Sequence, residues 1–241
     1  MATKVAGALV ERKQDSRAIL LDALAVYKAS DLTQIRIRAS AGSDIASEVA
    51  YSWFKHMLRT SEAIVTLADA GFDAEIAPLR RSLMEHCTAM FWLTRSPEKA
   101  VNSLFKAYQQ TLKKIEMATA GKWDINYDLL RTMAEAEMPP NDENNLLSFK
   151  ALTDAEEAQA TYAAWLQETA FSHAGWSTGR LYVKHDGTRL QLPDSDVRDS
   201  YRVTAMYLLF AADRLIDFWE NPPILLQQSH AALITRLFPG H

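Results

Sequence analysis

Residues 79–93 read LRRSLMEHCTAMFWL, and the spacing of their side chains decides the fold class. At 100° per residue, a set of apolar residues falls within about 80° of Leu79 on one face of a helix. This set comprises Ile76, Leu83, Cys87, Met90 and Leu93. The spacing predicts an amphipathic helix over about 73–95 that stops before Pro97.

The rest of the chain also consists mostly of helix-forming residues. Glycine and proline are scarce, at eight each, and long stretches contain neither. Thr153 with Glu156 forms a capping-box pattern at the start of one further helix. The predicted helices cover residues 4–28, 44–70, 73–95, about 97–119, 125–137, 153–174, 195–220 and 224–237. We therefore predict an all-α fold, an irregular bundle of about seven helices.

One segment departs from the helical pattern. Residues 180–192, RLYVKHDGTRLQL, have alternating apolar residues on both sides of Asp186-Gly187. This alternation around Asp-Gly predicts a small β-hairpin insertion near 181–192, with a type I′ turn.

Length and composition fit a single helical domain. The chain has 241 residues, of which 48% are hydrophobic and 23% are charged, as in ordinary globular proteins. We expect one domain over 1–241, with its core over about 44–220 and a short C-terminal helix over 224–237.

Charge and apolar runs restrict the class of partner. The net charge of −4 argues against bulk nucleic-acid binding. The longest apolar run, residues 203–212, is about half of what a membrane span needs. The single cysteine, Cys87, excludes an internal disulfide and a cysteine metal cluster. We expect a cytoplasmic protein without membrane contact.

The polar residues of the 79–93 stretch allow two interpretations. Arg81 and Glu85 are spaced i, i+4 and form an ion pair on the side away from the apolar stripe, whereas His86 falls within the stripe. Either the pair and the histidine are structural, or they form a site. Arg81 and His86 point about 140° apart, so one substrate reaches both only across the helix or with help from a second chain.

Residues 81–98, RSLMEHCTAMFWLTRSPE, resemble the central motif of a bacterial family of unknown function, the one numbered 5677. Arg81 and Glu85 match its first element. Tyr162, together with Ser172 and His173 of FSHAGW, matches its second. The resemblance covers about residues 50–200. It implies a helical fold and no established reaction.

This resemblance suggests a geometric idea. Tyr162, Leu166, Thr169 and His173 share one stripe of a helix, with His173 in its last turn. If that helix packs against the 73–95 helix, then Arg81, Glu85, Tyr162 and His173 converge. The alternative is that His173 only caps the end of its helix.

The chain also resembles the HEPN superfamily of helical RNases and toxins, in which four to six residues separate an arginine from the histidine that follows it. Arg81 or Arg80 with His86 fits that spacing. The resemblance implies metal-independent RNA cleavage at a dimer interface, with histidine transferring a proton and arginine stabilising phosphate charge. Ser82 occupies a position that is typically Asn, Asp or His. The same spacing recurs at Arg180–His185 and Arg236–His241, so it is not specific.

Other chemistries lack their sequence patterns. No histidine follows a glutamate by three residues, which excludes the di-iron bundle motif, and no two histidines are spaced for a shared zinc. Glycine-rich phosphate loops are also absent. We therefore expect no metal and no cofactor.

Residues 206–219, MYLLFAADRLIDFW, are the predicted homodimer face.

Two functions remain open. The first is an HEPN-like, metal-independent endoribonuclease in stress or phage defence, with Arg81 holding phosphate, His86 transferring the proton and Glu85 orienting Arg81. The second is a non-enzymatic helical module that binds a protein partner or small ligand through a pocket of Arg81, Glu85 and His173. Arg80, Tyr162 and Ser172 are further candidate binding residues.

Overall fold

Two helices from distant parts of the chain form the centre of the bundle: α3 (Ala77–Arg95) and α9 (Ser200–Phe218). They pack against each other along their buried faces. This computed structural model describes residues 2–38, 43–119, 126–135, 148–174, 184–186, 189–191 and 199–239.

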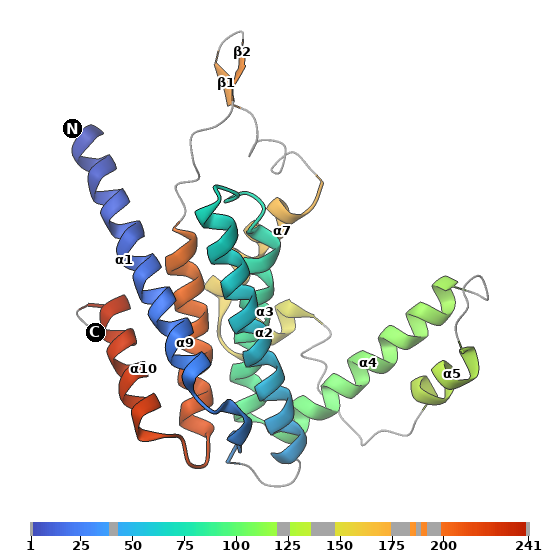
Figure 1. The fold of residues 1–241 in the computed structure, drawn as a ribbon. Helices are drawn as coiled ribbons and strands as arrows, with labels where there is room; N and C mark the ends of the chain where they lie inside the picture. The colour runs from blue at the N-terminus through green and yellow to red at the C-terminus, as the bar shows by residue number, and fades with distance from the viewer. Residues whose placement is uncertain are drawn as a thin grey trace.

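Three further helices surround this central pair. They are α1 (Ala2–Ala29), α2 (Ser43–Asp69) and α10 (Ile224–Leu237). All three pack on α9, and α2 also packs on α3 (Figure 1). A short 3₁₀ helix, η1 (Leu32–Gln34), follows α1, and the chain after it is held to the end of α9 by a bridge between Ile37 and Trp219.

The remaining helices lie on the other side of α3. Helices α6 (Phe149–Ala155) and α7 (Gln159–Ser172) pack against α3. Helix α4 (Pro97–Thr119) begins next to α3 and carries α5 (Tyr127–Glu135) away from the bundle, as Figure 1 shows. Helix α7 is thus one of the elements that place polar side chains beside α3.

The all-α class is confirmed, with nine α-helices in the described part of the chain against about seven predicted. The capping-box prediction at Thr153 is wrong. Thr153 lies inside α6, and its hydroxyl donates to the carbonyls of Phe149 and Lys150. Ser148 is the residue that caps α6, since its side chain accepts from the backbone N–H of Ala151.

Within the residues that the structure describes, strand structure is limited to two three-residue segments, β1 (Lys184–Asp186) and β2 (Arg189–Gln191), which pair antiparallel. Gly187, and with it the predicted type I′ turn, lies outside the described residues. Two paired strands of three residues each are too few and too short to be stable on their own. We therefore do not count the predicted hairpin insertion as an element of the fold.

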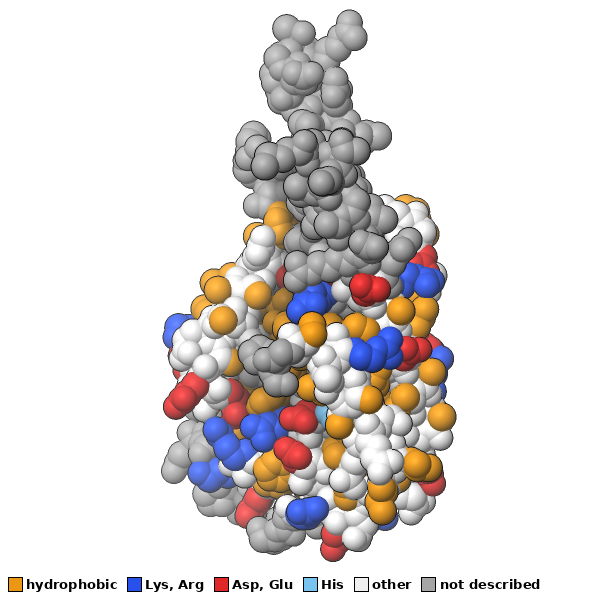
Figure 2. All heavy atoms as spheres, turned by 90° about the vertical axis from the view of Figure 1, so that its left-hand side faces the viewer, with side chains coloured by type: hydrophobic (Ala, Val, Ile, Leu, Met, Phe, Trp, Pro, Cys, Tyr) orange, Lys and Arg blue, Asp and Glu red, His pale blue; other side chains and the backbone are white. Residues whose placement is uncertain are grey.

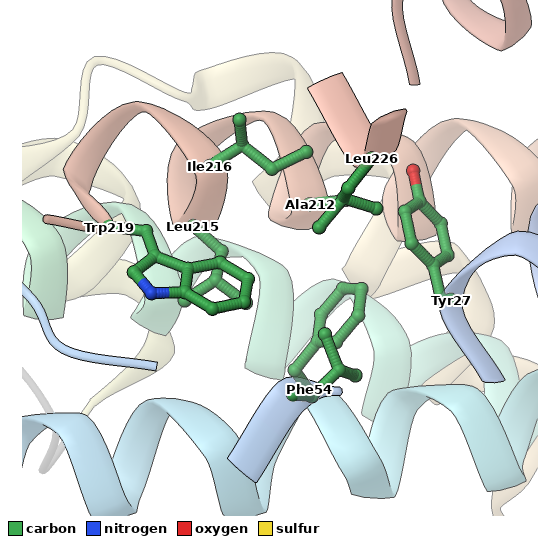
Figure 3. Close-up of a pocket in the computed structure, with 8 residues that line it drawn as sticks. Tyr27, Phe54, Ala212, Leu215, Ile216, Trp219 and Leu226 are labelled. Atoms are coloured by element: carbon green, nitrogen blue, oxygen red, sulfur yellow. The ribbon is translucent and has the colours of Figure 1, made fainter. Parts of the chain in front are cut away.

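The hydrophobic core extends beyond the predicted 44–220 at both ends. Helix α1 contributes Leu20 and Tyr27, and α10 contributes Leu226 and Leu237. Residues from α1, α2, α9 and α10 meet around Tyr27, Phe54 and Trp219 in Figure 3. The space left between them is about 10 Å³, which is at the lower limit for a single water molecule, so the core is well packed here.

The predicted dimer face over 206–219 is wrong. Leu208, Leu209, Ala212 and Leu215 are almost completely buried within the chain. The reason is that α9 is the central helix, covered by α1, α2, α3 and α10. A continuous apolar run therefore marks a helix that is surrounded by its own chain.

The outer surface carries both signs of charge. On the described part of the face that holds α1 and α10, Lys and Arg side chains are interspersed with Asp and Glu (Figure 2). This face does not offer a field of one sign to a polyanion. None of the helices that the structure describes is long and apolar enough to span a membrane.

Candidate functional site

Arg80 is a buried structural residue. Its side chain is 1% exposed, and its guanidinium forms a bidentate pair with the carboxylate of Glu168, with Nε–Oε1 and Nη2–Oε2 distances of 3.0 Å. The remaining Nη1 donates to the Ser200 hydroxyl at 2.8 Å. This network joins α3, α7 and α9 in the interior. Because its donors are used internally, the geometry does not support Arg80 as a binding residue.

Arg81, the next residue, lies at the surface between α3 and α7. Its Nε donates to Glu85 Oε1 at 3.0 Å, and its guanidinium carbon lies 4.7 Å from the centre of the Trp165 ring. The Trp165 indole N–H donates to the same Glu85 oxygen at 2.7 Å. Arg81 Nη1 lies 3.3 Å from His173 Nε2. We call Arg81, Glu85, Trp165 and His173 the Arg81 cluster.

The Arg81–His173 contact has one possible direction. A guanidinium only donates hydrogen bonds, so His173 Nε2 is the acceptor in this contact. The prediction that His173 lies in the last turn of its helix is wrong. Helix α7 ends at Ser172, and His173 follows it with extended backbone. Its side chain therefore turns back toward α3.

The Arg81 cluster is open to solvent and bordered by aromatic rings. The side chains of Arg81 and Glu85 are 28% and 37% exposed, and His173 is exposed. Tyr162 stacks on Trp165, with ring centres 5.9 Å apart and planes 15° apart. An ion pair flanked by partly exposed aromatic faces can bind a ligand that combines a charged and a flat apolar part.

His86 lies on the opposite side of α3, against α2. Its ring centre is 4.5 Å from that of His56 and 6.1 Å from that of Trp53, and its Nδ1 lies 2.8 Å from the Ser82 carbonyl oxygen. Burial lowers the pKa of His86, while the bond to Ser82 opposes that shift. The ring is half-buried and accepts a proton less readily than a free histidine.

The structure therefore divides the predicted site residues. Arg81, Glu85 and His173 come together, and Tyr162 joins them through Trp165. His86 does not join them. Ser172 does not either, because its hydroxyl donates to the carbonyl of Glu168 at 2.7 Å and completes the last turn of α7.

Two residues of the site region were missed from the sequence. Trp165 follows Tyr162 by three positions, so the helical stripe through Tyr162 contained a signal for it. Glu168 was not singled out, and no local pattern connects it with Arg80, which lies 88 residues earlier in the chain. Only the packing of α7 on α3 brings these two together.

Cys87 is not suited to nucleophilic chemistry. It is buried, and its burial raises the pKa of the thiol to about 12, so that the thiolate is scarce at neutral pH. The described residues contain no group of three or more His, Cys, Asp or Glu side chains placed to hold a metal ion.

Comparison with known proteins supports one of the two resemblances. No curated protein and no solved structure matches the chain, and nothing in the comparisons shows the HEPN resemblance. Residues 47–165, which run from α2 into α7, match the family model described as "Family of unknown function (DUF5677)". The matched residues include Arg81, Glu85, Tyr162 and Trp165, and the match ends before Ser172 and His173.

Proposed function

We propose that the protein is a non-enzymatic helical module that binds a small carboxylate ligand, or a carboxylate side chain of a partner, at the Arg81 cluster. The observation that carries this proposal is the position of the Arg81 guanidinium. It lies at the surface between the Glu85 carboxylate, the His173 imidazole and the face of Trp165, contributed by two helices that pack on each other.

The chemistry of the cluster favours a carboxylate with a flat apolar group. Arg81 uses Nε on Glu85 and Nη1 on His173, and no described residue is hydrogen-bonded to Nη2. This nitrogen can donate to an incoming carboxylate. The partly exposed rings of Trp165 and Tyr162 supply a surface for the apolar part of the ligand.

The geometry gives less support to ribonuclease chemistry. Proton transfer and phosphate stabilisation must act on the same phosphodiester, yet Arg81 faces α7 while His86 faces α2. Cleavage would need a second chain to supply the missing partner.

The proposal is tested by titrating phenylacetate and following the tryptophan indole N–H signals by NMR. The Trp165 signal is assigned with Trp165→Phe. We expect phenylacetate to shift the Trp165 signal in a saturable manner, and Arg81→Gln to abolish the shift. Arg17→Gln is the matched control, because Arg17 forms an exposed bidentate pair with Asp69 on α1 and α2, away from the Arg81 cluster.

Two results would contradict the proposal. One is a Trp165 signal that does not respond to phenylacetate, or that responds equally in wild type and Arg81→Gln. The other is cleavage of single-stranded RNA without added metal that is lost in both Arg81→Gln and His86→Gln. That second result would establish the nuclease function instead.

A further inference from the structure

A second cavity lies further along α3 than the Arg81 cluster, beside Cys87, Thr88 and Phe91. It has a volume of about 210 Å³ and opens between α3, the turn that joins α6 to α7, and α9. Cavities of roughly 150 Å³ in other proteins hold a benzene ring. This cavity is therefore large enough for a small aromatic molecule, unlike the gap of about 10 Å³ in Figure 3.

The walls of this cavity are mostly apolar. Phe91 of α3 and Phe210 of α9 contribute aromatic rings, and Met206 contributes a flexible thioether. The guanidinium carbon of Arg214 lies 4.7 Å from the centre of the Phe91 ring. Rings with a flexible methionine form a lining that accepts a flat hydrophobic molecule.

One wall carries a buried carboxylate. The Glu156 side chain lines the cavity and is only 7% exposed. Arg95 Nη2 approaches Glu156 Oε1 to 2.8 Å, but no described donor reaches this oxygen with hydrogen-bond geometry. A carboxylate has about four acceptor positions, so Glu156 retains the capacity to accept from a ligand. Burial raises the pKa of Glu156, and Arg95 and Arg214 oppose that rise.

Three hydroxyl-bearing residues complete the polar part of the lining: Thr88, Thr161 and Tyr207. The Thr88 hydroxyl donates to the carbonyl of Met84 at 2.8 Å. Burial raises the pKa of Tyr207 to about 12, so the phenol stays neutral. Among the residues that line the cavity, Glu156 is the one with a buried side-chain oxygen that lacks a hydrogen bond.

We propose that this cavity binds a small aromatic molecule with a single N–H or O–H donor, which bonds to the Glu156 carboxylate while the ring packs between Phe91 and Phe210. Such a polar group in an apolar pocket fixes both orientation and specificity, because an analogue without the donor leaves the buried carboxylate unsatisfied. The site is independent of the Arg81 cluster.

The test compares indole with benzofuran, which has the same shape but lacks the N–H. Binding to the full-length protein is measured by isothermal titration calorimetry. We expect indole to bind about tenfold more tightly than benzofuran, because a hydrogen bond to a charged group is lost in benzofuran. Glu156→Gln should reduce this preference several-fold. Glu157→Gln, the same change on an exposed neighbour, should leave it unchanged.

A blocking variant places the binding in the cavity. Ala158 lines the cavity, so Ala158→Leu should fill part of it and abolish binding of both probes. Circular dichroism and the melting temperature check that each variant is folded. The proposal is overturned if wild type binds neither probe, if it binds both equally, or if a folded Glu156→Gln or Ala158→Leu variant retains the wild-type affinities.

Discussion

Arg80 and Arg81 are neighbours in the chain with opposite environments. Arg80 is 1% exposed and donates three hydrogen bonds to buried groups on α7 and α9. Arg81 is 28% exposed and contacts one carboxylate, one imidazole and one indole ring at the surface. One step of 100° around α3 separates an arginine that joins three helices in the interior from an arginine that lies at the surface.

The comparison shows that burial, and not residue type, decides what these arginines do. A buried ion pair depends on both partners, because removal of one leaves an uncompensated charge in a low-dielectric interior. A surface pair is screened by water and contributes little to stability. Its groups can therefore exchange one partner for another at low cost, which is the property that a binding surface needs.

The largest effect is expected for Glu168→Gln. This change leaves the Arg80 guanidinium buried without a compensating charge, so we expect the free energy of unfolding to fall by about 3–5 kcal/mol. Urea denaturation measures the loss. Glu116→Gln, at the surface pair with Arg131, is the control and should leave the urea midpoint close to that of wild type. Equal, small effects in both variants would contradict the structural role of Arg80.

Replacing both partners sharpens the same point. Arg80→Met combined with Glu168→Leu removes the charges together and leaves apolar side chains among Leu83 and Ile76 of the core. We expect this double variant to recover most of the stability lost in Glu168→Gln, since apolar replacement of a buried pair is often neutral or stabilising. A double-variant loss that equals or exceeds the single loss in urea denaturation would show that packing, not charge, is the main contribution.

A smaller effect is expected in the pH dependence of stability. Burial lowers the pKa of His86 in the folded state, so the unfolded chain binds a proton first as the pH falls below about 6.5. Stability contributed by neutral His86 is therefore present above that pH and is lost as the pH falls toward the folded pKa. His86→Phe should make the decrease in unfolding free energy between pH 6.5 and 5 shallower. An unchanged slope would show that His86 is not the residue responsible.

The smallest effect on stability is expected for Arg81→Ala. Loss of the surface pair with Glu85 and of the contact with Trp165 should lower the unfolding free energy by only about 1 kcal/mol. Urea denaturation of this variant beside Arg17→Ala provides the check. A loss as large as that of Glu168→Gln would place Arg81 among the structural residues and remove the basis of the proposed function.

Local spacing was enough to predict much of α3. The residues predicted to form the apolar stripe, including Leu83, Cys87, Met90 and Leu93, are all buried. The Arg81–Glu85 pair forms as predicted, because both of its members lie on one helix at i, i+4. Features set by neighbours within about one turn are readable from the sequence.

Features that depend on packing between helices were not readable in the same way. Burial of Arg80 is produced by Glu168 and Ser200, which lie 88 and 120 residues further along the chain. His86 lies in the middle of the predicted buried stripe, yet it is only half-buried. Its neighbour on α2 is the polar side chain of His56. The predicted convergence of His173 on Arg81 rested on the family resemblance and on the idea that α7 packs against α3.

The most direct test of the difference between these neighbours is the parallel substitution of each arginine by lysine. Arg80→Lys and Arg81→Lys make the same chemical change on adjacent residues, and both are measured by urea denaturation and by the phenylacetate titration of the Trp165 signal. We expect Arg80→Lys to lose about 3 kcal/mol of stability and, while folded, to keep the phenylacetate response. Arg81→Lys should keep nearly all of its stability and lose most of that response. The reverse pattern, or equal behaviour of the two variants, would contradict the division between a structural and a ligand-binding arginine.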